Sequence, residues 1–153
     1  MRNVTPVRIR RAGRPDLEAI SIIERQSYGP EERWELEDYQ EDFDEEGTIY
    51  LVAEAGGAVI GYAIGDTEDG LYVTALTTTE TWRGRGIGHA LLQELIAVSG
   101  AAHCVLDVRA DNHPAIGLYR KFGFETTAHH PDHYGPGVHA VEMTLTRPVP
   151  VSC

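Results

Sequence analysis

The most informative stretch of this 153-residue sequence is Arg83-Gly84-Arg85-Gly86-Ile87-Gly88. It follows Leu71–Thr78, which is typical of a strand, and leads into a segment to about Ser99 whose apolar residues fit one helical face. Glycines in a strand-to-helix turn let the backbone approach a ligand closely, and the amide groups at the helix start attract an anion. Pyrophosphate is the natural ligand of such a turn, although a tight turn without a ligand would use the same glycines.

This turn differs from two familiar phosphate-binding motifs. The dinucleotide fingerprint requires Gly-x-Gly-x-x-Gly early in a parallel strand–helix–strand unit, and a Walker loop requires a Lys-Ser/Thr pair that does not follow Gly88. The turn therefore indicates neither of these nucleotide-binding motifs.

Outward from the turn, the hydrophobic pattern and the Gly and Pro positions predict seven strands and four helices. The first helix opens at Pro15-Asp16 and breaks at Gly29-Pro30, and Gly56-Gly57 is a favourable hairpin turn. The predicted strands are Val7–Arg11, Thr48–Glu54, Ala58–Asp66, Leu71–Thr78, His103–Arg109, Phe124–His130 and Val138–Thr146; the other helices run from about Glu31 to Phe43, from the glycine turn to about Ser99, and from Pro114 to Phe122.

The order of these elements predicts an α/β fold. Two strand–helix–strand units in the second half indicate one mixed sheet of about seven strands, with about four helices on its two faces. At this length we expect a single domain over residues 1–153, with its core at about 7–146 and a frayed tail at 147–153.

Composition excludes several classes of protein. Thirteen Lys and Arg against 24 Asp and Glu give a net charge of −11, which disfavours nucleic-acid binding but permits cationic partners. No stretch approaches the roughly 18 apolar residues of a membrane span, and the basic start is not followed by an apolar run, so we expect no signal peptide and no anchor. Cys104 and Cys153 are too few for a disulfide framework or a cysteine zinc site, which favours the cytoplasm.

Two segments resemble the acetyl-CoA-binding motifs of the GNAT acetyltransferase superfamily. The first joins Leu76-Thr77-Thr78 to Trp82–Leu92, which contains the glycine turn; the second combines Leu106–Asn112 with Ala115–Phe124. Within the superfamily, the pattern resembles the RimI-type enzymes, which acetylate the N-terminal α-amines of proteins.

The resemblance covers nearly the whole chain, from about residue 7 to 146, and it implies the GNAT fold. Glu24–Tyr28 resembles the first substrate loop of RimI-type enzymes. His133–Pro136 and Ala140–Met143 resemble their Tyr-rich loop and last strand.

The resemblance also implies where acetyl-CoA and the acceptor bind. The Arg83–Gly88 turn would hold the pyrophosphate, and backbone groups of Leu76, Thr77 and Thr78 would hold the pantetheine and the acetyl carbonyl. Asn112 and Ala115 would border the pantetheine and thiol end, together with Tyr119. The expected acceptor contacts are Ser27, Tyr28 and Tyr134, and the implied reaction requires no metal.

Acetyl transfer to an amine needs a neutral amine, a stabilised oxyanion and a proton for the leaving thiolate. The resemblance makes Tyr119 the proton donor to the thiolate, because a phenol with its ordinary pKa near 10 is protonated at pH 7. The alternative is a core tyrosine on the apolar stripe of its helix.

Asp107 lies where RimI carries a glutamate general base, twelve residues before Tyr119. The shorter carboxylate departs from that pattern, so we expect it to act through an ordered water. Asp107 alternates with Leu106 and Val108, which should face the other side of the sheet. A structural salt bridge is the alternative role for Asp107.

The ordinary pKa values of the possible acceptor amines favour an α-amine over a lysine as the acceptor. An α-amine with a pKa of 7.7–8.0 is roughly 10–20% neutral at pH 7, whereas a lysine with a pKa near 10.4 is about 0.04% neutral. A weak, short base therefore suits an α-amine better. The predicted activity is N-terminal protein acetylation, and the alternatives are acetylation of a lysine or a small amine, or a non-catalytic acetyl-CoA-binding regulatory domain.

Two clusters of titratable residues remain. Residues 31–46 contain ten acids, which form either a solvated helix face or a guide for a cationic protein N-terminus such as that of a ribosomal protein. Four histidines are close in sequence, which could suggest a metal site, but a wall of the acceptor cleft is the favoured interpretation. These histidines are His129, His130, His133 and His139.

Overall fold

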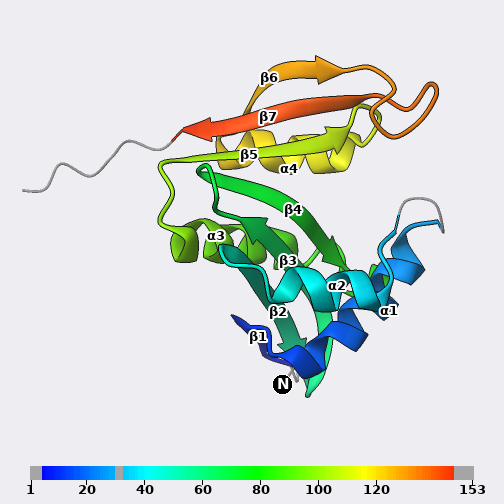
Figure 1. Cartoon of the computed structure of the whole chain (residues 1–153), viewed down its shortest axis with the longest axis vertical. Coiled ribbons are helices and arrows are strands. Elements are labelled where there is room, and N and C mark those ends of the chain that lie inside the picture. Colours follow the sequence, from blue (N-terminus) through cyan, green and yellow to red (C-terminus); the bar gives the residue numbers. More distant parts are fainter. Residues whose placement is uncertain (1–4, 30–32, 147–153) are drawn as a thin grey trace, which may run out of the picture.

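The computed structural model describes residues 5–29 and 33–146. They form one seven-stranded sheet with the strand order β1-β2-β3-β4-β5-β7-β6 (Figure 1). Every neighbouring pair is antiparallel except β4 and β5, which are parallel. The predicted mixed α/β sheet is therefore confirmed. Its strands are β1 (Val7–Arg11), β2 (Thr48–Ala55), β3 (Ala58–Asp66), β4 (Leu71–Thr78), β5 (His103–Arg109), β6 (Glu125–His130) and β7 (Ala140–Thr146).

Four α-helices and two short 3-10 helices complete the described fold. The α-helices are α1 (Leu17–Ser27), α2 (Leu36–Phe43), α3 (Ile87–Ser99) and α4 (His113–Phe122), and the 3-10 helices are η1 (Arg14–Asp16) and η2 (Glu80–Trp82). The order of helices and strands is the predicted one. None of the helices described here has both the length and the apolar character that crossing a membrane requires.

The predicted start of the second helix at Glu31 is wrong. Residues 31 and 32 lie outside the described residues, and the helix begins only at Leu36. Glu35 has extended backbone angles, and its amide donates to the Asp38 carboxylate at 2.9 Å. This capping interaction sets the helix start, because it satisfies an amide group at the end of the helix.

Two smaller differences concern the starts of the last two strands. β6 begins at Glu125, one residue after the predicted start, and β7 begins at Ala140 instead of Val138. Val138 belongs to the preceding turn, where its amide donates to the Gly135 carbonyl at 3.0 Å. The tail predicted at 147–153 lies outside the described residues.

Side-chain alternation along the strands divides the core between the two faces of the sheet. Leu51 packs on one face with the apolar stripe of α3, whereas Tyr50 and Val52 pack on the other with α1 and α2. Figure 1 shows α3 and the α1–α2 pair on opposite sides of the strands. The expected helices on both faces are therefore present.

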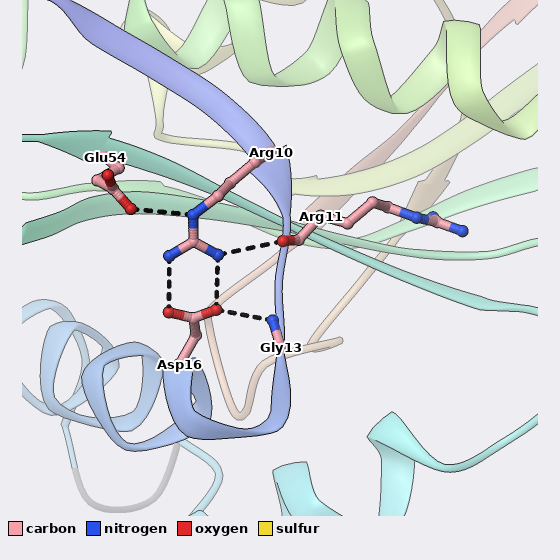
Figure 2. A network of polar contacts seen from close by, with 5 residues as sticks. All are labelled: Arg10, Arg11, Gly13, Asp16 and Glu54. Carbon is pink, nitrogen blue, oxygen red and sulfur yellow. Dashed lines mark hydrogen bonds and ion pairs between the residues drawn. The ribbon is translucent and has the colours of Figure 1, made fainter. Parts of the chain in front are cut away.

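Arg10 ties the first strand to the elements that follow it (Figure 2). Its guanidinium donates to both carboxylate oxygens of Asp16, at 2.8 and 3.0 Å, and its Nε donates to Glu54 on β2 at 2.9 Å. Asp16 also accepts the Gly13 amide at 2.7 Å. The hydrogen bonds from Arg10 hold the pKa of Asp16 below its ordinary value, so the pair stabilises the fold at neutral pH and this contribution is lost in acid.

The pairing of β4 with β5 positions the site. The two parallel strands pair only at their beginnings, where Leu71 lies beside Cys104 and Tyr72 beside Val105. Beyond these pairs the strands diverge (Figure 1). The far end of β4 therefore pairs with β3 on one edge and leaves its other edge open.

Candidate active site

Two adjoining hollows open where β4 and β5 separate. We call the first the turn groove: it lies between the end of β4, the glycine turn and the start of α4. We call the second the central cleft: it lies between β4 and β5 and reaches α1 and α4. Both hollows are lined by Tyr28, Leu76, Asn112 and Ala115, so they are continuous. A ligand in the turn groove can therefore extend into the central cleft.

The glycine turn has the backbone that the sequence predicts for an anion site. Gly84 and Gly86 have φ angles of +76° and +80°, and a Cβ atom at either would meet no other atom within 4 Å. Gly86 caps α3, whose first backbone hydrogen bond runs from the Ala90 amide to the Gly86 carbonyl at 3.0 Å. The amides that precede Ala90 point out of the helix end, where the helix dipole favours negative charge.

The arginines of the turn have different surroundings. Arg83 lines the turn groove, and its Nε donates to the Thr78 carbonyl at 3.2 Å. The Arg85 guanidinium lies over the Trp82 ring, 4.6 Å from its centroid. Arg83 therefore links the turn to the end of β4. Arg85 instead packs on Trp82 and is not among the residues that line the groove.

The remaining predicted donor contacts surround the junction of the two hollows. Leu76, Thr77 and Thr78 line the turn groove along the open edge of β4. Asn112 caps α4, because its side-chain oxygen accepts the Ala115 amide at 3.2 Å. These residues lie where the resemblance places the pantetheine, and their contact with acetyl-CoA stays a prediction.

Asp107 lines the central cleft, and its neighbours Leu106 and Val108 are buried in the core cluster with α3, so Asp107 faces the other side of the sheet, as alternation predicts. The Tyr72 hydroxyl donates to Asp107 Oδ2 at 2.6 Å. Asp107 Oδ1 is buried and has no hydrogen-bond partner among the described residues. One carboxylate oxygen is therefore held in place, and the other remains available to accept a proton.

The sequence argument missed Tyr72. A signal was present, because Tyr72 alternates with Leu71 and Val73, which are buried on the α3 face, and so must face the side of the sheet that carries Asp107. Burial raises the pKa of Tyr72 well above its ordinary value, with the Asp107 hydrogen bond as the second cause. Tyr72 therefore stays a hydrogen-bond donor to Asp107.

Tyr119 lies in α4, with 8% of its surface exposed, and lines the same cleft as Asp107. Burial raises the pKa of Tyr119 to about 12. Its phenol is therefore fully protonated near neutral pH, as a proton donor must be. The ring also lies 5.8 Å from that of Phe124, so Tyr119 both packs in the core and borders the cleft.

The three predicted acceptor residues do not share one hollow. Tyr28 and Tyr134 line the central cleft, and the Tyr28 hydroxyl lies 3.4 Å from Thr77 Oγ1. Ser27 is the last residue of α1, and its hydroxyl donates to the Ile23 carbonyl at 2.9 Å. Ser27 lines the turn groove instead of the central cleft.

Glu24 is a second residue whose place the sequence did not reveal. It is 8% exposed, lines the central cleft, and accepts hydrogen bonds from the Tyr39 and Tyr62 hydroxyls and, at 3.0 Å, from the Trp34 amide. Burial raises the pKa of Glu24. The sequence did contain a signal for this role, because Glu24 is an acidic residue on the otherwise apolar stripe of α1. Glu24 ties the segment between α1 and α2 to the sheet.

Three of the four clustered histidines have different surroundings. His139 Nδ1 accepts the Asp132 amide at 3.0 Å and so holds the β6–β7 turn. His133 packs edge-on against Tyr134, with 4.7 Å between ring centroids. His130 approaches Asp107 and Glu142, at 3.8 and 3.1 Å from its Nε2. His130 thus borders the candidate base, and His133 supports a cleft residue.

Comparisons with known proteins identify the family of the chain. The acetyltransferase (GNAT) family model matches residues 17–124. N-alpha-acetyltransferase RimI from Mycobacterium tuberculosis is 31% identical over 125 residues, which cover 78% of this chain and 79% of that protein. An uncharacterized protein of Mycobacterium leprae is 31% identical over 124 residues, which cover 78% of this chain but 34% of that longer protein.

Solved structures share the fold at lower identity. The ribosomal-protein-S18-alanine N-acetyltransferase of Escherichia coli has a TM-score of 0.83 at 23% identity, over 97% of this chain and 99% of that one. Arabidopsis thaliana NAA60 in complex with acetyl-CoA has a TM-score of 0.80 at 22% identity, over 92% and 98% of the two chains. Because the family model covers most of this sequence and the shared fold nearly all of it, the chain belongs to the acetyltransferase (GNAT) family.

Proposed function

We propose that this acetyltransferase transfers an acetyl group from acetyl-CoA to the N-terminal α-amine of a protein, by direct attack in a ternary complex. The observation that carries the proposal is the common cleft of Asp107 and Tyr119, which is continuous with the turn groove. A candidate base and a candidate acid thus border the place where the two substrates would meet. The similarity to the RimI enzyme of M. tuberculosis supports an α-amine acceptor.

The donor would enter through the turn groove. Its pyrophosphate would accept hydrogen bonds from the amides at the start of α3, while Gly84 and Gly86 leave the backbone uncovered. The pantetheine would follow the open edge of β4 toward Asn112 and Ala115. This route delivers the thioester to the junction with the central cleft.

The acceptor would enter the central cleft between Tyr28 and Tyr134. Asp107 Oδ1 would take a proton from the ammonium group, directly or through a water, and the neutral amine would attack the thioester carbonyl. A C–N bond forms, backbone amides along β4 stabilise the oxyanion, and the C–S bond then breaks. The thiolate receives the Tyr119 proton, and the extra proton on the acylated nitrogen returns to the Tyr119 oxygen, directly or through a water, which gives CoA and the acetylated amine and restores the phenol.

The acidic residues within and just after α2 support a cationic acceptor. Asp42 accepts the Tyr50 hydroxyl at 2.6 Å, and Asp44 pairs with Arg14, so these two acids have partners within the chain. Other acids of the segment are exposed, including Glu37, Glu41 and Glu45. Their charge would attract the basic N-terminus of a protein such as a ribosomal protein.

A peptide panel tests the acceptor class. We expect acetylation of a basic peptide with a free N-terminus and no lysine, and none of the same peptide with a blocked N-terminus. A blocked peptide that contains one lysine, and a set of small amines, should be poor acceptors. Activity confined to the lysine peptide or to the small amines would contradict the proposal, and binding of acetyl-CoA without any turnover would indicate a regulatory domain.

Removing the Tyr119 hydroxyl should slow the chemical step. For Tyr119→Phe we expect kcat to fall about 10²-fold, at the low end of general-acid effects, because a thiolate is already a fair leaving group. The phenyl ring keeps its packing against Phe124, so the Kd for acetyl-CoA should change little. Steady-state kinetics and calorimetry measure the two quantities. A native kcat in this variant would assign the proton to another group.

A further inference from the structure

Three metal-ligating side chains come together on neighbouring strands beside the central cleft. In the sheet, Asp107 on β5 lies opposite Glu142 on β7, and Glu142 lies opposite Ala128 on β6. His130 is two residues beyond Ala128 and therefore projects from the same face of β6. One ligand atom from each of Asp107, His130 and Glu142 lies within 4.8 Å of the other two.

The distances suit a small metal ion. His130 Nε2 lies 3.1 Å from Glu142 Oε1 and 3.8 Å from Asp107 Oδ1. Two ligands bound to Zn²⁺ at roughly 2.0–2.1 Å in tetrahedral geometry are about 3.4 Å apart. The two distances from His130 Nε2 each differ from this value by a few tenths of an ångström, and the two carboxylate oxygens lie within 4.8 Å of each other, so rotamer adjustments would bring the three atoms around one ion.

Hydroxyl groups hold the other carboxylate oxygens away from this point. The Tyr72 hydroxyl donates to Asp107 Oδ2 at 2.6 Å, and the Thr127 hydroxyl to Glu142 Oε2 at 3.2 Å. Oδ1 of Asp107 and Oε1 of Glu142 are thus the oxygens turned toward His130. Hydrogen bonds to the outer atoms of ligands orient many metal sites in proteins in this way.

The Asp107 oxygen in this group, Oδ1, lacks a hydrogen bond within the described part of the chain. The Asp107 side chain is 12% exposed, and its Oδ1 has no hydrogen-bond partner among the described residues. A divalent cation would satisfy this buried oxygen and neutralise the two carboxylates. One imidazole nitrogen and two carboxylate oxygens favour zinc or a similar transition metal over Mg²⁺ or Ca²⁺, which prefer oxygen ligands alone.

We propose that Asp107, His130 and Glu142 form a binding site for Zn²⁺ or a similar divalent transition-metal ion, and that the bound ion inhibits acetyl transfer. The ion would occupy Oδ1 of Asp107 and prevent it from accepting the proton of the amine. The binding site stands on geometry alone, whereas the inhibition rests on the proposed function, in which Asp107 is the base. The ion is an inhibitor in this scheme and not a cofactor.

Calorimetric titration of the untagged protein with ZnCl₂, without acetyl-CoA or acceptor, tests the site. We expect saturable binding of one ion, weakened about tenfold or more in both His130→Gln and Glu142→Gln. His129→Gln is the matched control, because His129 is the neighbouring histidine on the opposite face of β6, and it should bind like the native protein.

The absence of saturable binding, or equal affinity in the native protein and both variants, would overturn the site. The inhibition is tested separately with the free N-terminal peptide: ZnCl₂ should inhibit the native enzyme and His129→Gln, whereas His130→Gln should retain activity at concentrations that inhibit the native form. Binding without inhibition of an active native enzyme would overturn the inhibitory role. A native protein that acetylates no peptide would overturn the proposed function, and the titration would still decide the metal site.

Discussion

Acetyl-CoA affinity is expected to fall about 100-fold when Gly86 is replaced by valine. A side chain at this position would project into the open space beside the start of α3, where the pyrophosphate has to approach the backbone. A hydrogen bond to a charged group contributes about 1.5–3 kcal/mol. The loss of about two such bonds corresponds to roughly 3 kcal/mol or more, and each 1.4 kcal/mol is a tenfold change in Kd. Calorimetry with acetyl-CoA measures the effect.

The chain offers a matched control for the strain in this variant. Gly57 in the β2–β3 hairpin has a φ of +81°, against +80° for Gly86, and a Cβ atom there also meets nothing within 4 Å. Valine at either position therefore has a similar left-handed backbone cost, about 1–2 kcal/mol, and urea unfolding should show similar losses of stability. Only Gly86→Val should lose acetyl-CoA affinity. Equal affinities in the two variants would remove the glycine turn from the donor site.

Local sequence patterns were sufficient for most of the fold. The alternation in Leu71–Thr78, the Gly56-Gly57 turn and the apolar stripe of α3 each involve residues close together in the chain, so their structure follows from short-range rules. The start of α2 could not be predicted in this way. The segment is rich in acidic residues and has no apolar periodicity that would mark where the helix begins. There the capping contact between Asp38 and the Glu35 amide sets the boundary.

The surroundings of Asp107 required the register of the sheet. Tyr72 is 35 residues away in sequence, as is Glu142, and both approach Asp107 only because β4 and β7 flank β5. Alternation could show that Asp107 faces away from Leu106, but not which side chains of neighbouring strands it meets. The histidine cluster shows the same limit: spacing alone did not distinguish His130, which reaches Asp107, from His139, which holds a turn.

Asp107→Asn tests the base and the acceptor class together. Asparagine keeps the shape of the side chain, and its oxygen can still accept the Tyr72 hydroxyl, but the amide is not basic. With a free N-terminal peptide, we expect the rate to fall about 10²-fold or more at pH 6–7, within the range of general-base effects. The deficit should shrink towards pH 9, where roughly nine tenths or more of an α-amine with a pKa of 7.7–8.0 is already neutral.

The pH dependence distinguishes this role from a structural one. If Asp107 only positioned Tyr72 or held the sheet, the ratio of the Asn variant to the native rate would be the same at pH 6 and pH 9. Were the acceptor a lysine, the deficit would persist at pH 9, because most of that amine would still be charged. Asp107→Glu is the matched control: it retains a carboxylate one methylene longer, and we expect it to match or exceed the native rate across the range. Parallel pH–rate profiles of the native, Asn and Glu forms on one lysine-free peptide therefore decide whether Asp107 accepts the proton of the incoming amine.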